Sequence, residues 1–387
     1  MKNGDTGAST HTHLDLRSSD RIGIGVYFVA IVLLLLYSFT QIDLNLTIST
    51  VPLVTRIVDV FRYVGYFNRP LSTVLFAIII LALTAGYIWL IHMAKEGRLS
   101  RQWLTRIVIG TPLLLLVSYP AFSYDFFNYL FTSRTVLLYH ANPYTVIPLS
   151  YMGVDPYLSF MRWTHLTSAY TPMWILLSLV PYLVGLNFFI TEVVSLKALL
   201  ALSYVIVAFG IWKIQKSEGD SEAALSVILF ACNPLVIIES LVSSHNDIAM
   251  MAVAILSLVL SKKKVLSFFM LSVSVSLKMM TFFLLPAFFF HWNRILAFVG
   301  MILALVVVSF TREPLAWYML WVIPFASLVP KKRWLIYSVI AASLGFLVRY
   351  MPYLYLGNWD PPVMYYKNVL SSIAVFLTFG IFAIDHV

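Results

Sequence analysis

The chain has 387 residues, of which 60% are hydrophobic, 16% aromatic and only 11% charged, and its formal net charge is +9. This balance excludes an ordinary soluble globular protein, because most of the surface would then be apolar. The Lys and Arg residues stand in short clusters between long apolar runs, so the positive charge indicates membrane topology and no nucleic-acid partner. The single cysteine, Cys232, lies in an apolar run and excludes an intramolecular disulfide framework.

A polar N-terminal segment precedes the first apolar run, which covers residues 22–40. The run is long enough to cross a membrane and no small-residue cleavage pattern follows it, so it predicts a retained transmembrane helix. We therefore expect 1–21 to be a disordered cytosolic tail and 22–103 to form two N-terminal transmembrane helices with an outer loop between them. Residues 104–387 are then the main helical core.

Further apolar runs follow along the whole chain and predict an all-α, polytopic transmembrane helical bundle with about 11–13 membrane segments. Runs of spanning length lie at 22–40, 71–93, 104–121, 193–212, 223–241, 295–311, 335–350 and 368–385. Shorter apolar runs lie at 173–186, 248–261, 265–277, 279–290 and 315–329.

Cationic clusters determine the predicted orientation, because Lys and Arg gather on the cytosolic side of membrane helices. These clusters lie at 95–106, 213–216, 262–264, 294 and 331–333. They predict a multi-pass protein of the plasma membrane with a cytosolic N-terminus and with outer segments at 41–70, 122–172, 243–247 and 351–367. Two apolar runs then lie between the large outer loop and Lys213, where one crossing is needed. Either 173–186 lies in the interface or re-enters, or Lys213 and Lys216 face outward.

Charged side chains within or beside the apolar runs are candidate functional residues, because inserting each one into a membrane is costly. Under the predicted topology nearly all of them gather on the outer side, namely Asp125, Arg134, His140, His245, Asp247, Lys278, Arg349 and Asp360. This arrangement indicates one site and not a pathway across the membrane. The sequence also shows no internal repeat of the kind that many transporters carry.

The first candidate segment, residues 123–144, alternates aromatic residues with polar ones and directly follows the third long run. Such a mixture suits an amphipathic helix at the membrane interface, within the large outer loop 122–172. A partly desolvated carboxylate there, Asp125, can act as a general base on a hydroxyl group. Asp is also a common helix N-cap, and its spacing does not separate the two roles.

The second candidate segment, residues 233–251, contains consecutive polar residues between two apolar runs: Ser243, Ser244, His245, Asn246 and Asp247. They can border a site, or form an ordinary loop in which Asp247 caps the next helix. Lys278 lies further on in an apolar stretch that we expect to be a broken helical hairpin. An ammonium group in such surroundings needs an anion, either a lipid phosphate or an acidic side chain such as that of Asp247.

The order of these features resembles that of a known group of enzymes. A Tyr-Asp pair at 124–125 is followed by Asn-Pro-Tyr at 142–144, Tyr-Thr-Pro at 170–172, Asn-Pro at 233–234, His-Asn-Asp at 245–247 and a lone Lys278. Over residues 104–367 the chain resembles the GT-C superfamily of polyprenyl-phosphate-sugar-dependent glycosyltransferases, in particular the bacterial alpha-1,6-mannosyltransferases of lipomannan synthesis. The glycines usual in Gly-x-x-Pro-Tyr and Tyr-Gly-Pro are replaced, near Ala141 and at Thr171, which leaves the sugar and the acceptor open.

This resemblance implies a GT-C-like fold and roles for particular residues. Asp125 would be the catalytic base with His245 and Asp247 beside it, and Lys278 and Arg349 would bind the donor phosphate. The substrate cavity would be shaped by Tyr124, Asn128, Arg134, Asn142, Tyr144, Tyr170 and Asn246. The implied reaction moves a sugar, by resemblance mannose, from a polyprenyl-phosphate donor held in the lipid bilayer to a hydroxyl of a glycan or glycolipid acceptor. It would proceed on the outer face, with inversion and without a metal or other cofactor.

Two other functions stay open at this point. A flippase or transporter of a lipid-linked sugar would spread its polar residues through the depth of the membrane. A non-enzymatic membrane assembly factor would give no reason for an isolated Lys278 opposite an outer carboxylate.

Overall fold

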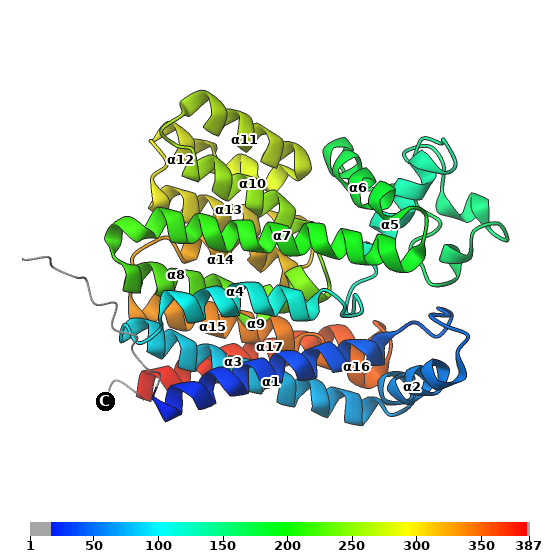
Figure 1. The fold of residues 1–387 in the computed structure, drawn as a ribbon, viewed down its shortest axis with the longest axis horizontal. Coiled ribbons are helices and arrows are strands. Elements are labelled where there is room, and N and C mark those ends of the chain that lie inside the picture. Colours follow the sequence, from blue (N-terminus) through cyan, green and yellow to red (C-terminus); the bar gives the residue numbers. More distant parts are fainter. Residues whose placement is uncertain (1–16, 385–387) are drawn as a thin grey trace, which may run out of the picture.

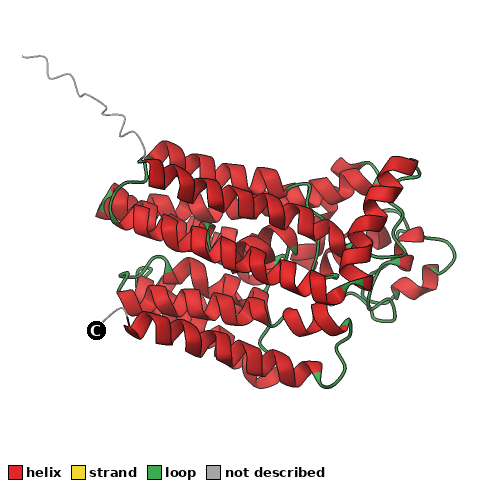
Figure 2. Ribbon diagram, turned by 90° about the horizontal axis from the view of Figure 1, so that it is seen from below, coloured by secondary structure: helices red, strands yellow, loops and turns green. Residues whose placement is uncertain are grey.

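The computed structural model describes residues 17–384, so residues 1–16 of the expected cytosolic tail lie outside the described residues. The described part consists of helices and loops without a strand, as the sequence predicts, and its long helices run side by side along the molecule (Figures 1 and 2). The α-helices are α1 (Ser18–Ser38), α2 (Pro52–Arg62), α3 (Arg69–Lys95), α4 (Arg101–Leu115), α5 (Asp125–Leu137), α6 (Pro172–Gly185), α7 (Phe189–Gln215), α8 (Asp220–Ala231), α9 (Pro234–Ile237), α10 (Asp247–Val259), α11 (Lys264–Leu277), α12 (Leu285–Phe289), α13 (Arg294–Thr311), α14 (Met319–Ala326), α15 (Arg333–Val348), α16 (Met351–Leu356) and α17 (Val363–Ile384).

Many of these helices are apolar enough for a membrane. Among the described residues, five are also long enough to cross one: Ser18–Gln41, Arg69–Lys95, Phe189–Glu218, Arg294–Thr311 and Arg333–Leu356. Shorter apolar helices lie at Pro172–Gly185, Asp247–Val259, Lys264–Leu277, Met279–Phe289, Ala316–Ala326 and Val363–Leu377. The long and short helices together agree with the predicted polytopic bundle.

The predicted span 223–241 is not a straight helix. It is divided into Asp220–Ala231 and Pro234–Val242, which are bent by 55°. The break has a local cause, because Asn233 accepts hydrogen bonds from the backbone N–H groups of Leu235 and Val236 and so caps a new helix. Pro234 then occupies the first helical turn, where its missing N–H is no loss.

The expected broken hairpin around Lys278 is confirmed. Helix α11 ends at Leu277, Lys278 has an extended backbone, and a 3-10 turn at Met279–Leu284 leads into α12. The large outer loop predicted at 122–172 contains α5 and two short 3-10 turns. The sequence therefore located the break at Lys278 and the long loop at 122–172, although it did not show which residues they contact.

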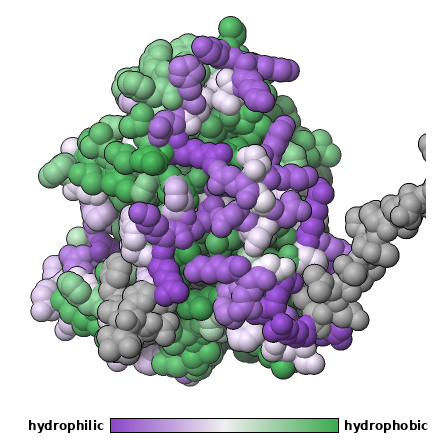
Figure 3. Space-filling view, turned by 90° about the vertical axis from the view of Figure 1, so that its left-hand side faces the viewer, coloured by the Kyte–Doolittle hydropathy of each residue, from purple (hydrophilic) through white to green (hydrophobic). Residues whose placement is uncertain are grey.

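The loops with the cationic clusters gather at one end of the bundle. The loops that carry the cationic clusters at 95–101, 213–216, 262–264 and 331–333 lie at the end drawn on the left in Figure 1. Hydrophilic side chains gather on that end face (Figure 3). Helices α2, α5, α6 and α16 lie toward the opposite end (Figure 1). This separation agrees with the positive-inside pattern, while the orientation in a membrane stays a prediction.

The N-terminal helices are part of the same bundle. Helix α1 packs against α3 and α4, and α3 in turn contacts α8 and α16. On the other side, α7 packs against α6, α8 and α10, while α5 contacts α6. The start of α5 lies beside the turn that precedes α10, since Asp125 and His245 are 3.7 Å apart. Tyr350, between α15 and α16, contacts Glu239 in the segment before that turn.

Candidate active site

A cavity of about 700 Å³ lies among segments that are far apart in the sequence. Aromatic side chains form much of its wall, including Tyr66, Phe122, Tyr124, Trp163, Trp317, Tyr350, Tyr353 and Trp359. The charged side chains in the wall are Asp125, Arg162, Glu313, Arg349 and Lys367. A mainly apolar cavity of this size with a few charged groups is typical of a site that binds a small molecule or a chemical group.

Asp125 reaches this wall because α5 begins there. Phe122 has a φ of 68°, which turns the chain, and the Ser123 hydroxyl accepts a hydrogen bond from the Asp125 backbone N–H at 3.2 Å. The Asp125 carboxylate accepts a hydrogen bond from the Tyr170 hydroxyl at 3.3 Å, and α5 has no side-chain cap. The carboxylate is thus directed toward the site and away from the capping role that the sequence left open.

Burial and neighbouring charges change the acidity of Asp125, whose side chain is 25% exposed. Burial raises the pKa of the Asp125 carboxyl above its ordinary value, and the positive charge of Lys278 partly offsets this effect. The hydrogen bond from Tyr170 also lowers this pKa, whereas the negative charge of Asp247 raises it. A carboxylate with a raised pKa is a stronger base, which suits removal of a proton from a hydroxyl group.

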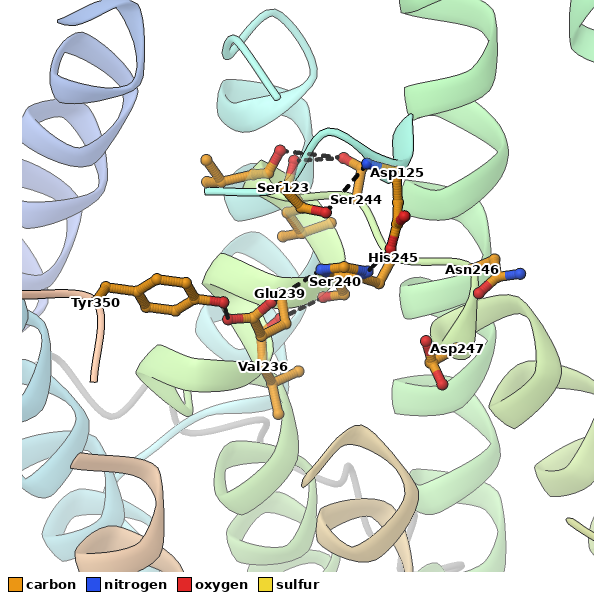
Figure 4. A network of polar contacts seen from close by, with 12 residues as sticks. Ser123, Asp125, Val236, Glu239, Ser240, Ser244, His245, Asn246, Asp247 and Tyr350 are labelled. Carbon is orange, nitrogen blue, oxygen red and sulfur yellow. Dashed lines mark hydrogen bonds and ion pairs between the residues drawn. The ribbon is translucent and has the colours of Figure 1, made fainter. Parts of the chain in front are cut away.

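His245 lies buried between two carboxyl groups (Figure 4). Its Nδ1 is 3.7 Å from Oδ2 of Asp125, and its Nε2 is 3.4 Å from Oε2 of Glu239. The imidazole also stacks on the ring of Trp317, with 4.1 Å between the ring centroids. Burial lowers the pKa of His245 from 6.5 to about 3, so the ring is neutral at physiological pH.

Lys197 of α7 stabilises the turn that carries His245. The Lys197 ammonium donates to the backbone carbonyl of Leu241 at 2.6 Å and to the hydroxyls of Ser118 and Ser244 at 3.0 and 3.3 Å. Ser244 has a φ of 59°, a backbone conformation that residues other than glycine rarely adopt. The residues of this turn are buried, and Asp247 is the first residue of α10 without forming a side-chain cap. A strained backbone beside a buried cation is typical of a functional site.

Asp247 and Lys278 form a second polar group beside Asp125. The Lys278 ammonium lies 2.8 and 2.9 Å from the two carboxylate oxygens of Asp247. The indole N–H of Trp321 also donates to Asp247, at 2.5 Å. Of the two anions considered for Lys278, the acidic side chain is therefore the partner seen here. A contact of Lys278 with a donor phosphate stays a prediction.

Arg349 lies in the cavity wall, as expected for a residue near a substrate. It pairs with Glu313 and donates a hydrogen bond to Asn368 at 2.9 Å. Lys367 shares the same acid, with its ammonium 2.6 Å from Oε1 of Glu313 and 5.3 Å from the centre of the Trp359 ring. Two cations around one carboxylate leave this part of the wall positively charged.

The other predicted cavity residues divide into two groups. Tyr124 lines the cavity, and Tyr170 contacts Asp125. Tyr144 lies beyond the wall, where its hydroxyl donates to the backbone carbonyl of Tyr170 at 2.7 Å and so supports that segment. Its neighbour Asn142 accepts a hydrogen bond from the Tyr144 backbone N–H at 3.0 Å.

Arg134 was predicted to line the cavity, but the structure places it elsewhere. It is buried, with its Nε 2.9 Å from Asp155 and its Nη1 2.6 Å from Asn187. It thereby ties the loop 138–171 to the segment between α6 and α7, and it does not belong to the cavity wall. Asn128 and Asn246 were also predicted to line the cavity, but they are not part of its wall. Asn128 lies one turn of α5 after Asp125. The backbone N–H of Asn246 donates to the Tyr129 hydroxyl at 3.5 Å.

Several residues around the site were not predicted, namely Lys197, Glu239, Glu313, Tyr350 and Lys367. Lys197 and Glu239 are lone charges inside apolar runs, which is the same signal that identified Lys278. Glu313 and Lys367 stand at the ends of apolar runs, where charged residues are common. Within residues 17–384, no group of three or more His, Cys, Asp and Glu side chains is placed to hold a metal ion. A reaction without a metal stays a prediction.

The chain matches a known protein family. A family model described as "alpha-(1->6)-mannopyranosyltransferase, N-terminal domain" matches residues 28–294. The matched region begins within α1 and ends at the first residue of α13, so it includes Asp125, the His245 turn and Lys278 as well as part of α1 and all of α3. No curated protein and no solved structure matches the chain significantly.

Proposed function

Because the chain belongs to the alpha-(1->6)-mannopyranosyltransferase family, we propose that it transfers mannose from a polyprenyl-phosphate donor to a hydroxyl of a glycan or glycolipid acceptor. The family description supports mannosyl transfer. The observation that carries the assignment of the site is the aromatic cavity in which the Asp125 carboxylate faces the same space as Arg349 and Lys367. Transfer from a phosphate donor requires a base that accepts the proton of the acceptor hydroxyl and positive charge beside the departing phosphate.

In the proposed reaction, Asp125 accepts the proton of the acceptor hydroxyl as its oxygen attacks the anomeric carbon of mannose. The bond from that carbon to the phosphate oxygen breaks on the opposite face, so the configuration inverts. Arg349 and Lys367 offset the negative charge that grows on the departing phosphate. The aromatic rings of the wall, Trp317 and Trp359 among them, offer apolar faces to the sugar and exclude water.

A lipid-linked donor is supported by the surroundings of the cavity. The chain has several helices that can cross a membrane, and a polyprenyl-phosphate sugar keeps its hydrocarbon tail in the bilayer. The cationic loops lie at the end of the bundle opposite α5 and α16, which supports a site on the outer face. We therefore propose a GT-C type enzyme that works at the outer leaflet of the plasma membrane.

The test uses the full chain in lipid nanodiscs, a radiolabelled polyprenyl-phosphate mannose and an alpha-1,6-linked oligomannoside acceptor. We expect transfer by the wild type and a loss of about 10²-fold or more in Asp125→Asn, because general base catalysis contributes about 10²- to 10⁴-fold. Asp59→Asn is the matched control, since Asp59 is exposed on α2 and outside the cavity wall. Transfer from nucleotide-linked mannose alone would exclude the lipid donor, and an unchanged rate in Asp125→Asn would exclude the proposed base.

A further inference from the structure

Glu239 is a fully buried carboxyl group in a segment that can cross a membrane. It lies on a π-helical turn, Ile238–Val242, a distortion that is frequent at functional sites. Its Oε1 accepts a hydrogen bond from the Tyr350 hydroxyl at 2.8 Å. Its Oε2 has no hydrogen-bond partner, and neither has Nε2 of His245, which it faces at 3.4 Å. Two unpartnered polar atoms that face each other inside a protein are costly and call for an explanation.

These contacts form a continuous line of groups that can carry protons (Figure 4). It runs from Asp125 to His245 over 3.7 Å, from His245 to Glu239 over 3.4 Å and from Glu239 to Tyr350 over 2.8 Å. Both ends of the line, Asp125 and Tyr350, lie in the wall of the same cavity, and Tyr350 adjoins Arg349. The line therefore leads from the proposed base around the cavity to its cationic wall.

The proposed reaction creates a need for such a path. The acceptor hydroxyl loses a proton to Asp125, while the donor phosphodiester becomes a phosphate monoester with a second negative charge, which can accept a proton. In an inverting displacement the base and the departing phosphate lie on opposite faces of the sugar. The proton cannot pass directly between them, and Asp125 must lose it before the next turnover.

We propose that His245, Glu239 and Tyr350 form a proton relay that carries the acceptor's proton from Asp125 to the departing phosphate; this inference rests on the proposed function. Protonated Asp125 gives its proton to Nδ1 of His245, and Nε2–H of the ring gives one to Oε2 of Glu239. The carboxyl group of Glu239 then turns so that the proton received at Oε2 faces the oxygen of Tyr350. Glu239 donates this proton to Tyr350, whose own hydroxyl proton passes to a phosphate oxygen. One proton has then moved from the acceptor to the phosphate, and Glu239 and Tyr350 have returned to their starting charge. His245 is left with its proton on Nδ1, so its imidazole must return to the Nε2–H form before the next turnover.

Other charged groups surround this line without interrupting it. Asp247 and Lys278 lie beside its start but neutralise each other, and Lys197 holds the turn that bears His245. The stacking of Trp317 on the imidazole keeps the ring in the plane that both carboxyl groups face. The 3.7 Å separation at Asp125 is longer than a hydrogen bond, and such contacts commonly tighten when substrate binds.

The relay is tested by separating the first turnover from steady-state turnover with rapid-quench measurements on the nanodisc enzyme. In Glu239→Gln and in Tyr350→Phe the first transfer is expected to stay within about twofold of the wild type, because Asp125 is still present. Steady-state transfer is expected to fall about tenfold or more and to recover as imidazole buffer is raised, because a diffusing base then removes the proton. Either variant suffices, so a folding defect in one leaves the other decisive.

Two matched controls exist in the chain. Glu192 is a fully buried carboxyl that also accepts a hydrogen bond from a tyrosine hydroxyl, that of Tyr157 at 3.0 Å, and Glu192→Gln lies off the relay. Tyr204 is a buried tyrosine that donates to the backbone carbonyl of Ala231, and Tyr204→Phe matches Tyr350→Phe. An equal loss in both kinetic phases without a response to imidazole would show that Glu239 only positions His245 and would overturn the relay. Unchanged steady-state rates would overturn it as well. Absence of transfer by the wild type would instead refute the proposed function.

Discussion

Lys278 and Asp247 form a two-pronged ion pair in which one ammonium lies 2.8 and 2.9 Å from the two oxygens of the carboxylate. Asp247 is fully buried and Lys278 is 31% exposed, so the pair is largely shielded from water. Trp321 binds the same carboxylate. The pair therefore places two opposite charges beside Asp125 while adding no net charge to the site.

The first prediction concerns the stability that depends on this pair. Lys278→Met leaves a buried carboxylate without its cation, which costs about 3 kcal/mol or more. Lys278→Met combined with Asp247→Leu removes both charges, and we expect much of the lost stability to return. The midpoint of thermal unfolding in detergent measures both effects. If the double variant is no more stable than Lys278→Met alone, the cost comes from packing and not from charge.

The second prediction concerns the pH dependence of transfer. Asp125 must be ionised to act as a base, and burial raises the pKa of its carboxyl, so activity is lost as the pH falls through this raised value. Lys278 lowers this pKa and Asp247 raises it. Lys278→Met should therefore move the acid limb of the kcat/KM profile to higher pH, and Asp247→Asn should move it to lower pH. Shifts in the same direction for both variants would remove Asp125 from the acid limb.

The third prediction concerns His245 and acid stability. The pKa of His245 is lowered by burial from 6.5 to about 3, so between these values the unfolded chain binds a proton there and the folded chain does not. The folded state is consequently destabilised as the pH falls below 6.5, by up to about 1.4 kcal/mol per pH unit. In His245→Gln this part of the dependence should disappear.

The measurement for His245 is the thermal unfolding midpoint in detergent between pH 7 and pH 5, the range that covers the ordinary titration of histidine. The matched control is His165→Gln, because His165 is an exposed histidine outside the cavity wall. An equally steep loss of stability in His245→Gln and in the wild type would assign the acid sensitivity to other groups.

The helices of this chain were predictable because an apolar run of spanning length specifies a helix with little help from tertiary contacts. Helices α3 and α13 accordingly agree closely with the runs at 71–93 and 295–311. The bend at 233–234 was not predicted, although Asn followed by Pro is a helix-start signal that the hydropathy of the run concealed.

The site was predictable only in part. Asp125 and His245 were expected together, and their side chains are 3.7 Å apart. The partners of charged residues depend on tertiary contacts, and for this reason Arg134 was expected in the cavity although it pairs with Asp155. Glu239 carried a readable signal, a lone charge in an apolar run, but only the polar turn at 243–247 of its segment was assigned to the site.

The last prediction concerns Glu313, which occupies the two cations that we assign to the donor phosphate. Its carboxylate pairs with Arg349 and lies 2.6 Å from the ammonium of Lys367, so a phosphate must compete with it for both. Arg349→Gln and Lys367→Gln should each raise the KM for polyprenyl-phosphate mannose, by about tenfold for the loss of one charged hydrogen bond. Glu313→Gln should lower this KM, because it removes the competing charge and keeps the shape of the side chain. If Glu313→Gln raises the donor KM as much as Arg349→Gln does, the carboxylate is needed to orient the cations, and the phosphate then binds beside the ion pair without displacing it.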